Sequence, residues 1–383
     1  MTTYPLFKLF KVHVNAGEAS RLIEDALRSG YVNEGAQVSQ LARALSTYLG
    51  AHDLTLMNSC TSAITVALRL SGVGPGDDVV STPMTCLATN TPITSAGANV
   101  VWADVDPDHG MLTPETVRAA ITPRTKAVIA VAWAGNPPDL EGIHAECRRA
   151  GVKFVLDAAH AFDAAYRGMP VHAWADHTCY SFQAIKHFTT GDGGALVCLD
   201  PTDHARARSL KWFGIDRDAA KDQRGDWRGQ QWDVDVAEAG YKFNMNNVAA
   251  AIGLSQLPYI DQIMGTHRCN AELYDQLLAK SPGLLLNART PDTQSSHWVY
   301  SVRIDPRRSR VDRDQLLAAL NGEGIMAGIV HVPNDGYSCF SSSKRDLPGV
   351  RCFSANQLSL PCGWWLRERD VWHIATRVKE LVR

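Results

Sequence analysis

The sequence predicts an α/β fold in which a large doubly wound domain precedes a smaller α+β domain. Short apolar, β-rich segments alternate with helical segments between about residues 54 and 182, and this spacing is typical of a sheet covered by helices on both faces. After about residue 290 the pattern changes to strands and helices of a separate module. We therefore place the domains at residues 1–264 and 265–383, and we allow the N-terminal segment to pack on the smaller one.

The first domain begins with two expected helices, and each of them ends at a glycine, which is a common helix stop. They are AGEASRLIEDALRSG and GAQVSQLARALSTYLG. The expected strands that follow are LTLMNS, DDVVST, NVVWADV, KAVIAVAW, KFVLDAA and HTCYSF. The helices between them are CTSAITVALRLSG, TPETVRAAI and LEGIHAECRRAG.

The second half of the chain opens with one long helical pattern over residues 248–280, which we expect to bend near Pro258 because proline removes a helical hydrogen bond. The smaller domain then contains two expected strands and two expected helices. In chain order they are WVYSVRI, VDRDQLLAALNGEG, IMAGIVHV and ERDVWHIATRVKELVR.

Composition excludes several classes of protein. The chain of 383 residues carries 38 basic and 40 acidic side chains, a balance that gives no electrostatic reason to expect nucleic acid or a membrane surface as a partner. Its apolar runs are too short to span a bilayer, and its N-terminus lacks a signal-peptide pattern. The nine cysteines form no CxxC pair. We therefore expect no zinc site and no disulfide framework, and a cytoplasmic location.

Two residues that follow neighbouring strands predict the chemistry. Asp157 ends the strand KFVLD, and Lys186 follows the strand that delivers Ser181. Ligands of α/β sheets bind beyond the carboxyl ends of the strands. Pyridoxal 5′-phosphate needs a lysine that binds its aldehyde and an acid that keeps its pyridine nitrogen protonated. Each residue alone also fits a solvated loop lysine or a strand-end cap, and the pair is what favours this cofactor.

A run of small polar residues is suited to the phosphate of that cofactor. Asn58, Ser59, Thr61 and Ser62 open a helix directly after the first strand. A helix N-terminus favours an anion, because its backbone N–H groups are unpaired there. An ordinary N-cap would need only one such hydroxyl.

The order of these motifs resembles the DegT/DnrJ/StrS family of fold-type I aminotransferases, and the resemblance extends from the SGYVNEG turn to the final helix. It therefore implies a large mixed sheet domain with a smaller α+β C-terminal domain. The motifs that carry it are NSCTSA, TPMTCLATN, ADVDP, DAAHAFDAAYRG, SFQAIKHFTTGDGGAL and GYKFNMNNVAAAIGLSQL.

The resemblance implies a role for each residue of the cofactor site. Lys186 would form the Schiff base and then move the proton, Asp157 would pair with the pyridinium nitrogen, and His160 would contact the phenolic oxygen of the ring. The phosphate would be held by Thr61, Ser62 and Ser181, with Gln183 as a weaker candidate for the cofactor site. Asn244 would reach the phosphate of the neighbouring subunit, so the resemblance implies a homodimer with shared active sites.

One position departs from the family pattern. Cys86 stands where an aromatic residue usually stacks on the pyridine ring, and a thiol offers less stacking area. Trp133 could substitute for the missing ring, or it could be an ordinary core tryptophan. The polar loop HVPNDGYSCF at residues 331–340 could likewise line a substrate entrance or form a surface turn.

The family mostly acts on nucleotide-linked keto-sugars, so the resemblance implies amination of such a sugar with glutamate as the amino donor. Sugar dehydratases of the same family typically replace the lysine with histidine, whereas Lys186 is present here. An aminocyclitol aminotransferase stays open as an alternative. A non-catalytic regulator that binds pyridoxal phosphate is a further alternative, and Cys86 is the one feature that favours it.

Overall fold

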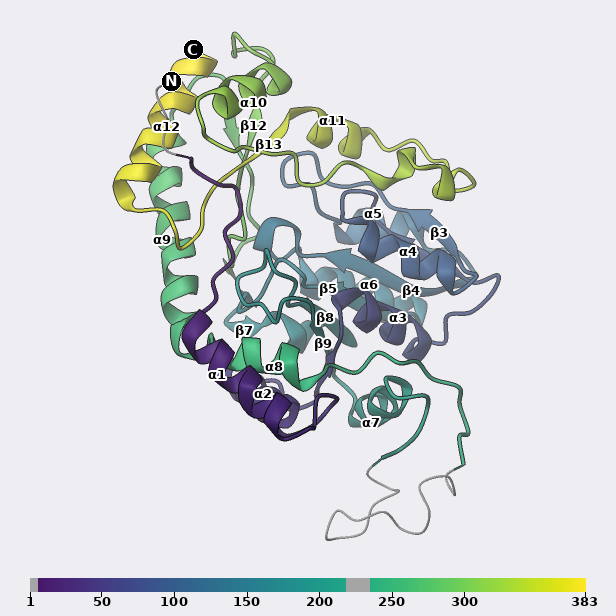
Figure 1. The fold of residues 1–383 in the computed structure, drawn as a ribbon. Helices are drawn as coiled ribbons and strands as arrows, with labels where there is room; N and C mark the ends of the chain where they lie inside the picture. The colour runs from purple at the N-terminus through teal and green to yellow at the C-terminus, as the bar shows by residue number, and fades with distance from the viewer. Residues whose placement is uncertain (1–5, 218–234) are drawn as a thin grey trace.

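The computed structural model describes residues 6–217 and 235–383, and its centre is a seven-stranded sheet of order β1-β9-β8-β5-β4-β2-β3 (Figure 1). Strand β9 is antiparallel to both of its neighbours, and the other pairs are parallel. The predicted mixed sheet is confirmed. Its strands are β1 (Leu54–Met57), β2 (Asp78–Ser81), β3 (Asn99–Trp102), β4 (Thr125–Val131), β5 (Lys153–Asp157), β8 (His177–Ser181) and β9 (Gly194–Cys198).

Helices pack against this sheet and beside it. Helix α3 lies across β5, β8 and β9, whereas α1 and α2 pack on α8. The helices are α1 (Ala16–Arg28), α2 (Ala36–Leu49), α3 (Cys60–Leu70), α4 (Leu87–Ser95), α5 (Pro114–Ala120), α6 (Leu140–Ala150), α7 (Pro201–Leu210) and α8 (Asn247–Leu254). Within the described ranges, none of the helices is long and apolar enough to cross a membrane.

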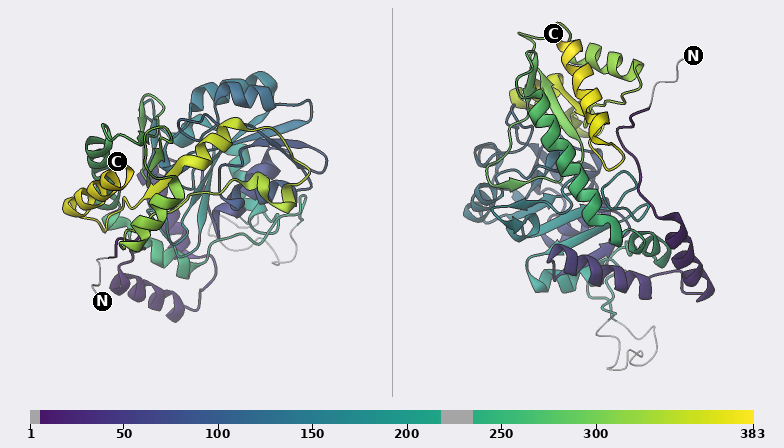
Figure 2. Two further views of the ribbon diagram at one scale, coloured as in Figure 1. Left: turned by 90° about the horizontal axis from the view of Figure 1, so that it is seen from above. Right: turned by 90° about the vertical axis from the view of Figure 1, so that its left-hand side faces the viewer.

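The C-terminal part of the chain builds a three-stranded antiparallel sheet with its own hydrophobic core. Helices α9 and α12 lie side by side along it, as Figure 1 and the right view of Figure 2 show. The elements are α9 (Ile260–Leu278), β10 (Leu284–Leu286), β12 (Tyr300–Ile304), α10 (Arg313–Gly322), α11 (Pro348–Asn356), β13 (Gln357–Leu360) and α12 (Glu368–Val382). A small third sheet contains β6 (Ala165–Tyr166), β7 (Met169–Pro170) and β11 (Thr293–Gln294).

The predicted boundary after residue 264 falls inside α9. The first residues of this helix, Ile260 and Met264, belong to the core of the large sheet, whereas Tyr274 and Leu278 belong to the second core. The N-terminal segment joins the second core through Phe7. The division of the chain at residue 264 stays a prediction, and α9 physically connects the two cores.

Two predicted elements of the C-terminal half are wrong. Residues 248–280 do not form one bent helix, because a 3₁₀ turn (Leu257–Tyr259) that contains Pro258 separates α8 from α9. The segment IMAGIVHV, predicted as a strand, does not form one. Among the described residues, its only β-type pairings are isolated bridges at Ile325 and Gly328. The sequence also did not predict the strands β9, β10 and β13 or the helices α4, α7 and α11.

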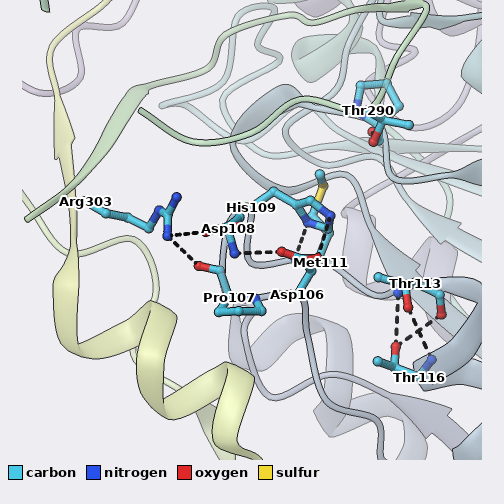
Figure 3. A network of polar contacts seen from close by, with 10 residues as sticks. Asp106, Pro107, Asp108, His109, Met111, Thr113, Thr116, Thr290 and Arg303 are labelled. Carbon is cyan, nitrogen blue, oxygen red and sulfur yellow. Dashed lines mark hydrogen bonds and ion pairs between the residues drawn. The ribbon is translucent and has the colours of Figure 1, made fainter. Parts of the chain in front are cut away.

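Side-chain contacts fix the small sheet against loops that follow strands of the large one (Figure 3). Arg303 on β12 donates to the backbone oxygen of Pro107 (2.9 Å) and to Asp108 Oδ1 (2.8 Å), in the loop after β3. Thr290 donates to the backbone oxygen of Pro137 after β4 at 2.8 Å. Because these loops follow the carboxyl ends of parallel strands, the second core lies beside the edge where the predicted site is expected.

Candidate active site

The predicted residues gather at the carboxyl ends of β5 and β8. Asp157 is the last residue of β5, and Ser181 is the last residue of β8; both are buried. Ser181 is paired with Gly194 of β9, whose backbone lies against the first turn of α3. The sheet order therefore places an acid, a hydroxyl and a helix N-terminus in one region.

The carboxylate of Asp157 is held by two neutral donors. Its Oδ2 accepts a hydrogen bond from Thr89 Oγ1 (2.6 Å), and its Oδ1 accepts one from the backbone N–H of Ala159 (3.0 Å). Burial raises the pKa of Asp157, while these hydrogen bonds and the Lys186 ammonium act in the opposite direction. No described residue forms an ion pair with this carboxylate, so its donor set fits a further, cationic partner such as a pyridinium N–H.

Lys186 lies in the loop between β8 and β9. Its backbone N–H donates to the oxygen of Gln183 at 2.9 Å, and its Nζ lies 3.5 Å from the centroid of the Trp298 ring. Although Lys186 retains some solvent exposure, desolvation by the surrounding packing lowers its pKa to about 8, against the opposing effect of Asp157. At pH 7 about a tenth of such a lysine is the neutral, nucleophilic amine.

His160 is a buried, neutral imidazole, because desolvation lowers its pKa well below the usual value. Its Nε2 lies 3.5 Å from Nε2 of His331, and its ring stacks on Trp298 at 3.9 Å between centroids. Its buried Nδ1 has no hydrogen-bond partner among the residues the structure describes. An unpaired ring nitrogen fits the predicted contact with the phenolic oxygen of the cofactor.

The start of α3 has the shape of an anion site. Ser59 is the N-cap, and its Oγ accepts from the backbone N–H of Ser62 (3.1 Å), whose own hydroxyl donates to Asn58 Oδ1 (2.6 Å). Thr61 lies in the same first turn. A Cβ on Gly194 would lie 2.5 Å from the nitrogen of Cys60. Only glycine therefore allows β9 to approach this helix N-terminus, which suits a phosphate group.

The side chains of two predicted residues form hydrogen bonds to neighbours that were not among the predicted site residues. Gln183 is exposed, and its Oε1 accepts from the backbone N–H of Ile185 at 3.1 Å. Asn244 is buried, and its Nδ2 donates to Asn33 Oδ1 at 2.9 Å. The backbone of Asn244 bridges to Met57, which precedes the polar turn of α3. Its role in a partner subunit stays a prediction.

Trp298 is an aromatic residue that contacts Lys186, and the sequence did not predict this contact. Cys86 is the N-cap of α4 and is exposed. Trp133 is 1% exposed and packs edge-on against Phe353 at 5.0 Å, so it is a core side chain. No local signal distinguished Trp298, because it lies 112 positions beyond Lys186 in an apolar stretch that predicts only a strand.

A buried hydrogen-bond network joins the loop at residues 331–340 to Asp157. Asn334 Nδ2 donates to the backbone oxygen of Thr85 (2.9 Å), and its Oδ1 accepts from Asn90 (2.9 Å). The Thr85 hydroxyl lies 2.7 Å from that of Thr89, which donates to Asp157. Of the two interpretations of this loop, the structure therefore favours the one in which it borders the site.

A separate hollow of about 460 Å³ contains none of the predicted site residues. It lies beside β1 and α2, where Leu54, Leu56 and Val38 contribute to its wall. Because the lysine, the carboxylate and the anion site lie elsewhere, we assign the chemistry to the β5–β8 edge and not to this hollow.

This fold and this site together define the class of a fold-type I aminotransferase. The family model for the DegT/DnrJ/EryC1/StrS aminotransferase family matches residues 15–379. The chain belongs to that family, and the predicted resemblance is confirmed.

Three relatives illustrate the range of the similarity. The spore coat polysaccharide biosynthesis protein SpsC of Bacillus subtilis (strain 168) is 30% identical over 366 residues, 94% of this chain and 93% of its own length. The sugar aminotransferase CalS13 of Micromonospora echinospora is 33% identical with a TM-score of 0.89, over 98% of this chain and 100% of its own. DesI, solved in the presence of its TDP-sugar product, is 26% identical with a TM-score of 0.85, over 98% and 93%.

Membership of the family establishes the chemistry at a coarse level. The protein is a sugar aminotransferase that depends on pyridoxal phosphate. The alternative of a non-catalytic regulator is not retained.

Proposed function

We propose that this aminotransferase moves an amino group from glutamate to the keto group of a nucleotide-linked sugar. The observation that carries the proposal is the similarity over almost the whole chain to DesI, whose structure was solved with a TDP-sugar product. The composition supports it as well. Because the overall charge is near neutral, a diphosphate would be held by local groups and not by a broad basic surface.

Lys186 performs the proton transfer in this proposal. Its Nζ would hold the aldehyde of the cofactor, and its free amine would remove a proton from the substrate carbon that carries nitrogen and return that proton later. Bound pyridoxal phosphate supplies a protonated ring that accommodates the resulting negative charge. A pKa of about 8 suits this work, because both forms of Lys186 are accessible near neutral pH.

Asp157 and His160 orient the ring in this proposal. The Asp157 carboxylate would accept a hydrogen bond from the pyridinium N–H and keep that nitrogen protonated. His160 offers its unpaired Nδ1 to the phenolic oxygen. Because His160 is a neutral imidazole, it adds no charge that would oppose the neighbouring ammonium.

The remaining predicted residues hold the cofactor more peripherally. Thr61 and Ser62 bind the phosphate from the first turn of α3, and Ser181 binds it from the end of β8. Gln183, in the loop that carries Lys186, and Cys86, at the N-terminus of α4, make weaker contacts with the cofactor in this proposal. We further propose a cytoplasmic homodimer in which Asn244 reaches the phosphate of the partner subunit's cofactor.

A panel experiment tests the substrate class and the donor. Purified enzyme with pyridoxal phosphate and glutamate is incubated with keto-sugars linked to TDP, UDP and GDP, with the free sugars and with keto-cyclitols, and the products are identified by mass spectrometry. Amination restricted to a nucleotide-linked sugar supports the proposal. Amination of a cyclitol or of the free sugar alone contradicts it, and so does loss of a hydroxyl group without gain of nitrogen.

A further inference from the structure

Trp298 touches three parts of the active site at once. Its ring lies 3.5 Å from Lys186 Nζ, its Nε1 donates to the backbone oxygen of Ile185 at 2.8 Å, and its ring stacks on His160 at 3.9 Å and 15°. The Trp298 side chain therefore contacts the Lys186 amine, the loop that carries this amine and the His160 imidazole, which is proposed to contact the cofactor ring.

The position of Trp298 is itself tightly fixed. The residue is 2% exposed, and its backbone N–H donates to the oxygen of Ala134 at 3.0 Å. A Cβ on Gly135 would lie 3.1 Å from the Trp298 nitrogen, so the glycine permits this close approach. Phe10 of the N-terminal segment also stacks on the ring, at 4.7 Å and 22°. A ring held this firmly can set the position of a flexible lysine.

We propose that Trp298 is a positioning residue that holds the Lys186 amine whenever it is not bonded to the cofactor. This inference rests on the proposed role of Lys186. The free amine takes up a proton and becomes an ammonium group, which the π face of the indole stabilises, and it gives the same proton back later in the cycle. The indole thus keeps the amine close to the reacting carbon through both proton transfers.

The ionisable groups around Lys186 determine how much the Trp298 ring contributes to the stability of its ammonium form. The ionisable groups that act electrostatically with Lys186 are Asp157, Cys60, Cys86, His160, His331 and His187. Burial keeps the three histidines neutral, and burial raises the pKa of the Cys60 thiol, so it stays protonated. Asp157, whose charge raises the pKa of Lys186, and the Trp298 ring, 3.5 Å from Nζ, both favour the ammonium form.

Three variants test this role. Trp298→Leu removes the π face and the indole N–H, whereas Trp298→Phe keeps an aromatic face and loses only the donor to Ile185. Trp102→Phe is the matched control, because Trp102 is equally buried and lies on the edge strand β3, packed on Phe340. Thermal unfolding and circular dichroism of all three show whether the fold is kept.

The first measurement is the pH dependence of Lys186 acetylation in the cofactor-free full-length protein, followed by mass spectrometry. Loss of the ring in Trp298→Leu should move the midpoint of reactivity to lower pH by about one unit, because a cation–π contact favours the ammonium. Trp298→Phe and Trp102→Phe should titrate close to the wild type. An unchanged or higher midpoint in a folded Trp298→Leu protein overturns the proposal.

The second measurement is the single-turnover reaction of the cofactor-loaded enzyme with glutamate, followed by absorbance. Trp298→Leu should lower the maximal rate about tenfold to a hundredfold with little change in the glutamate concentration for half-maximal rate, and Trp298→Phe should fall between it and the wild type. A Trp298→Leu enzyme with the wild-type rate overturns the proposal. Borohydride attachment of the cofactor to Lys186 is measured separately, so a failure of the proposed function is distinguishable from a failure of this inference.

Discussion

At the scale of single residues, the site combines a buried acid with a lysine whose amine is easily deprotonated. Asp157 is 4% exposed and bonded only to neutral donors in the described chain, and burial lowers the pKa of Lys186 to about 8. Burial of each group costs free energy, because desolvation disfavours the charged form of both side chains. Both become favourable when a cationic ring and a covalent bond to the lysine are supplied.

We expect Lys186→Ala to abolish turnover while the fold is kept. The amine is the only group in the proposal that binds the cofactor aldehyde and moves the proton. Borohydride reduction of the wild-type enzyme, followed by peptide mass spectrometry, should find the cofactor on the peptide that contains Lys186. Attachment to any other lysine would refute the assignment.

Asp157→Asn should impair the chemistry far more than the retention of cofactor. The substitution would remove the charge proposed to keep the pyridine nitrogen protonated, whereas the proposed phosphate contacts of Thr61, Ser62 and Ser181 would remain. Cofactor content after gel filtration and the rate of the glutamate half-reaction are the two measurements. A variant that keeps the wild-type rate would contradict the role of the carboxylate.

Thr89→Val should shift the acid limb of the activity profile to higher pH. The lost hydrogen bond lowers the pKa of Asp157 in the wild type, so without it the carboxylate takes up a proton at higher pH and activity is lost there. A hydrogen bond to a charged group contributes about 1.5–3 kcal/mol, or about one to two pKa units. Thr91→Val is the control, since Thr91 on the same helix is partly exposed and donates only to the backbone oxygen of Leu87. An acid limb that does not move would sink this prediction.

At the scale of elements, the anion site depends on how closely β9 approaches α3. That contact exists because Gly194 has no side chain, and it brings the end of β8 and the first turn of α3 together. The strand β9, which begins at Gly194, is not among the elements that the sequence predicted.

Gly194→Ala should weaken cofactor binding and destabilise the fold. The added methyl group would lie 2.5 Å from the Cys60 nitrogen and 2.7 Å from the Ser59 oxygen, and both belong to backbone that cannot move without displacing the proposed phosphate-binding turn. Overpacking of this kind costs about 1–3 kcal/mol. Spectroscopic titration with pyridoxal phosphate and chemical denaturation measure the two effects.

Gly265→Ala is the matched control for that substitution. Gly265 lies within α9, and nothing is found within 4 Å of the position its Cβ would take. Alanine should stabilise the helix there by up to about 1 kcal/mol and leave cofactor affinity unchanged. If both variants bound the cofactor like the wild type, the contact between β9 and α3 would have no part in phosphate binding.

The elements that carry local signals could be predicted from the sequence, whereas contacts between distant segments could not. Asp157 ends one strand and Lys186 follows another, and each strand can be identified from a segment of about five residues. Thr89 and Trp298 acquire their roles only when their segments reach these two residues in space, 68 and 112 positions away in the chain. The failed strand at residues 325–332 has the same cause, because β propensity does not tell whether a neighbouring strand is present.

At the scale of the whole molecule, two hydrophobic cores share α9 and meet beside the carboxyl edge of the large sheet. The order of strands and helices predicted the large core, because that order is encoded in consecutive segments. The position of the second core depends on contacts such as those of Arg303 (Figure 3), which join residues about 195 positions apart.

Subunit mixing should show that active sites are shared in a dimer. Lys186→Ala and Asn244→Ala subunits are each expected to be impaired, and the loss of a hydrogen bond to a charged phosphate costs roughly 1.5–3 kcal/mol. If Asn244 acts across the interface, a mixed dimer has one intact site and activity returns on exchange. A fully active Asn244→Ala enzyme, or no recovery after proven exchange, would remove the claim of shared sites.

The N-terminal segment joins the first and last parts of the chain, and this has a consequence for biosynthesis. Phe10 stacks on Trp298. The backbone of Phe7 forms hydrogen bonds with the backbone of Gly324 and Met326. The indole N–H groups of Trp364 and Trp365 donate to the backbone oxygens of Lys11 and Lys8, respectively. These partners leave the ribosome some 290 to 360 residues after the segment itself. At about 5–20 residues per second, the segment waits on the order of 15 to 70 seconds for them. A nascent chain can therefore assemble the large sheet early, but the surroundings of Lys186 are complete only when translation is almost finished.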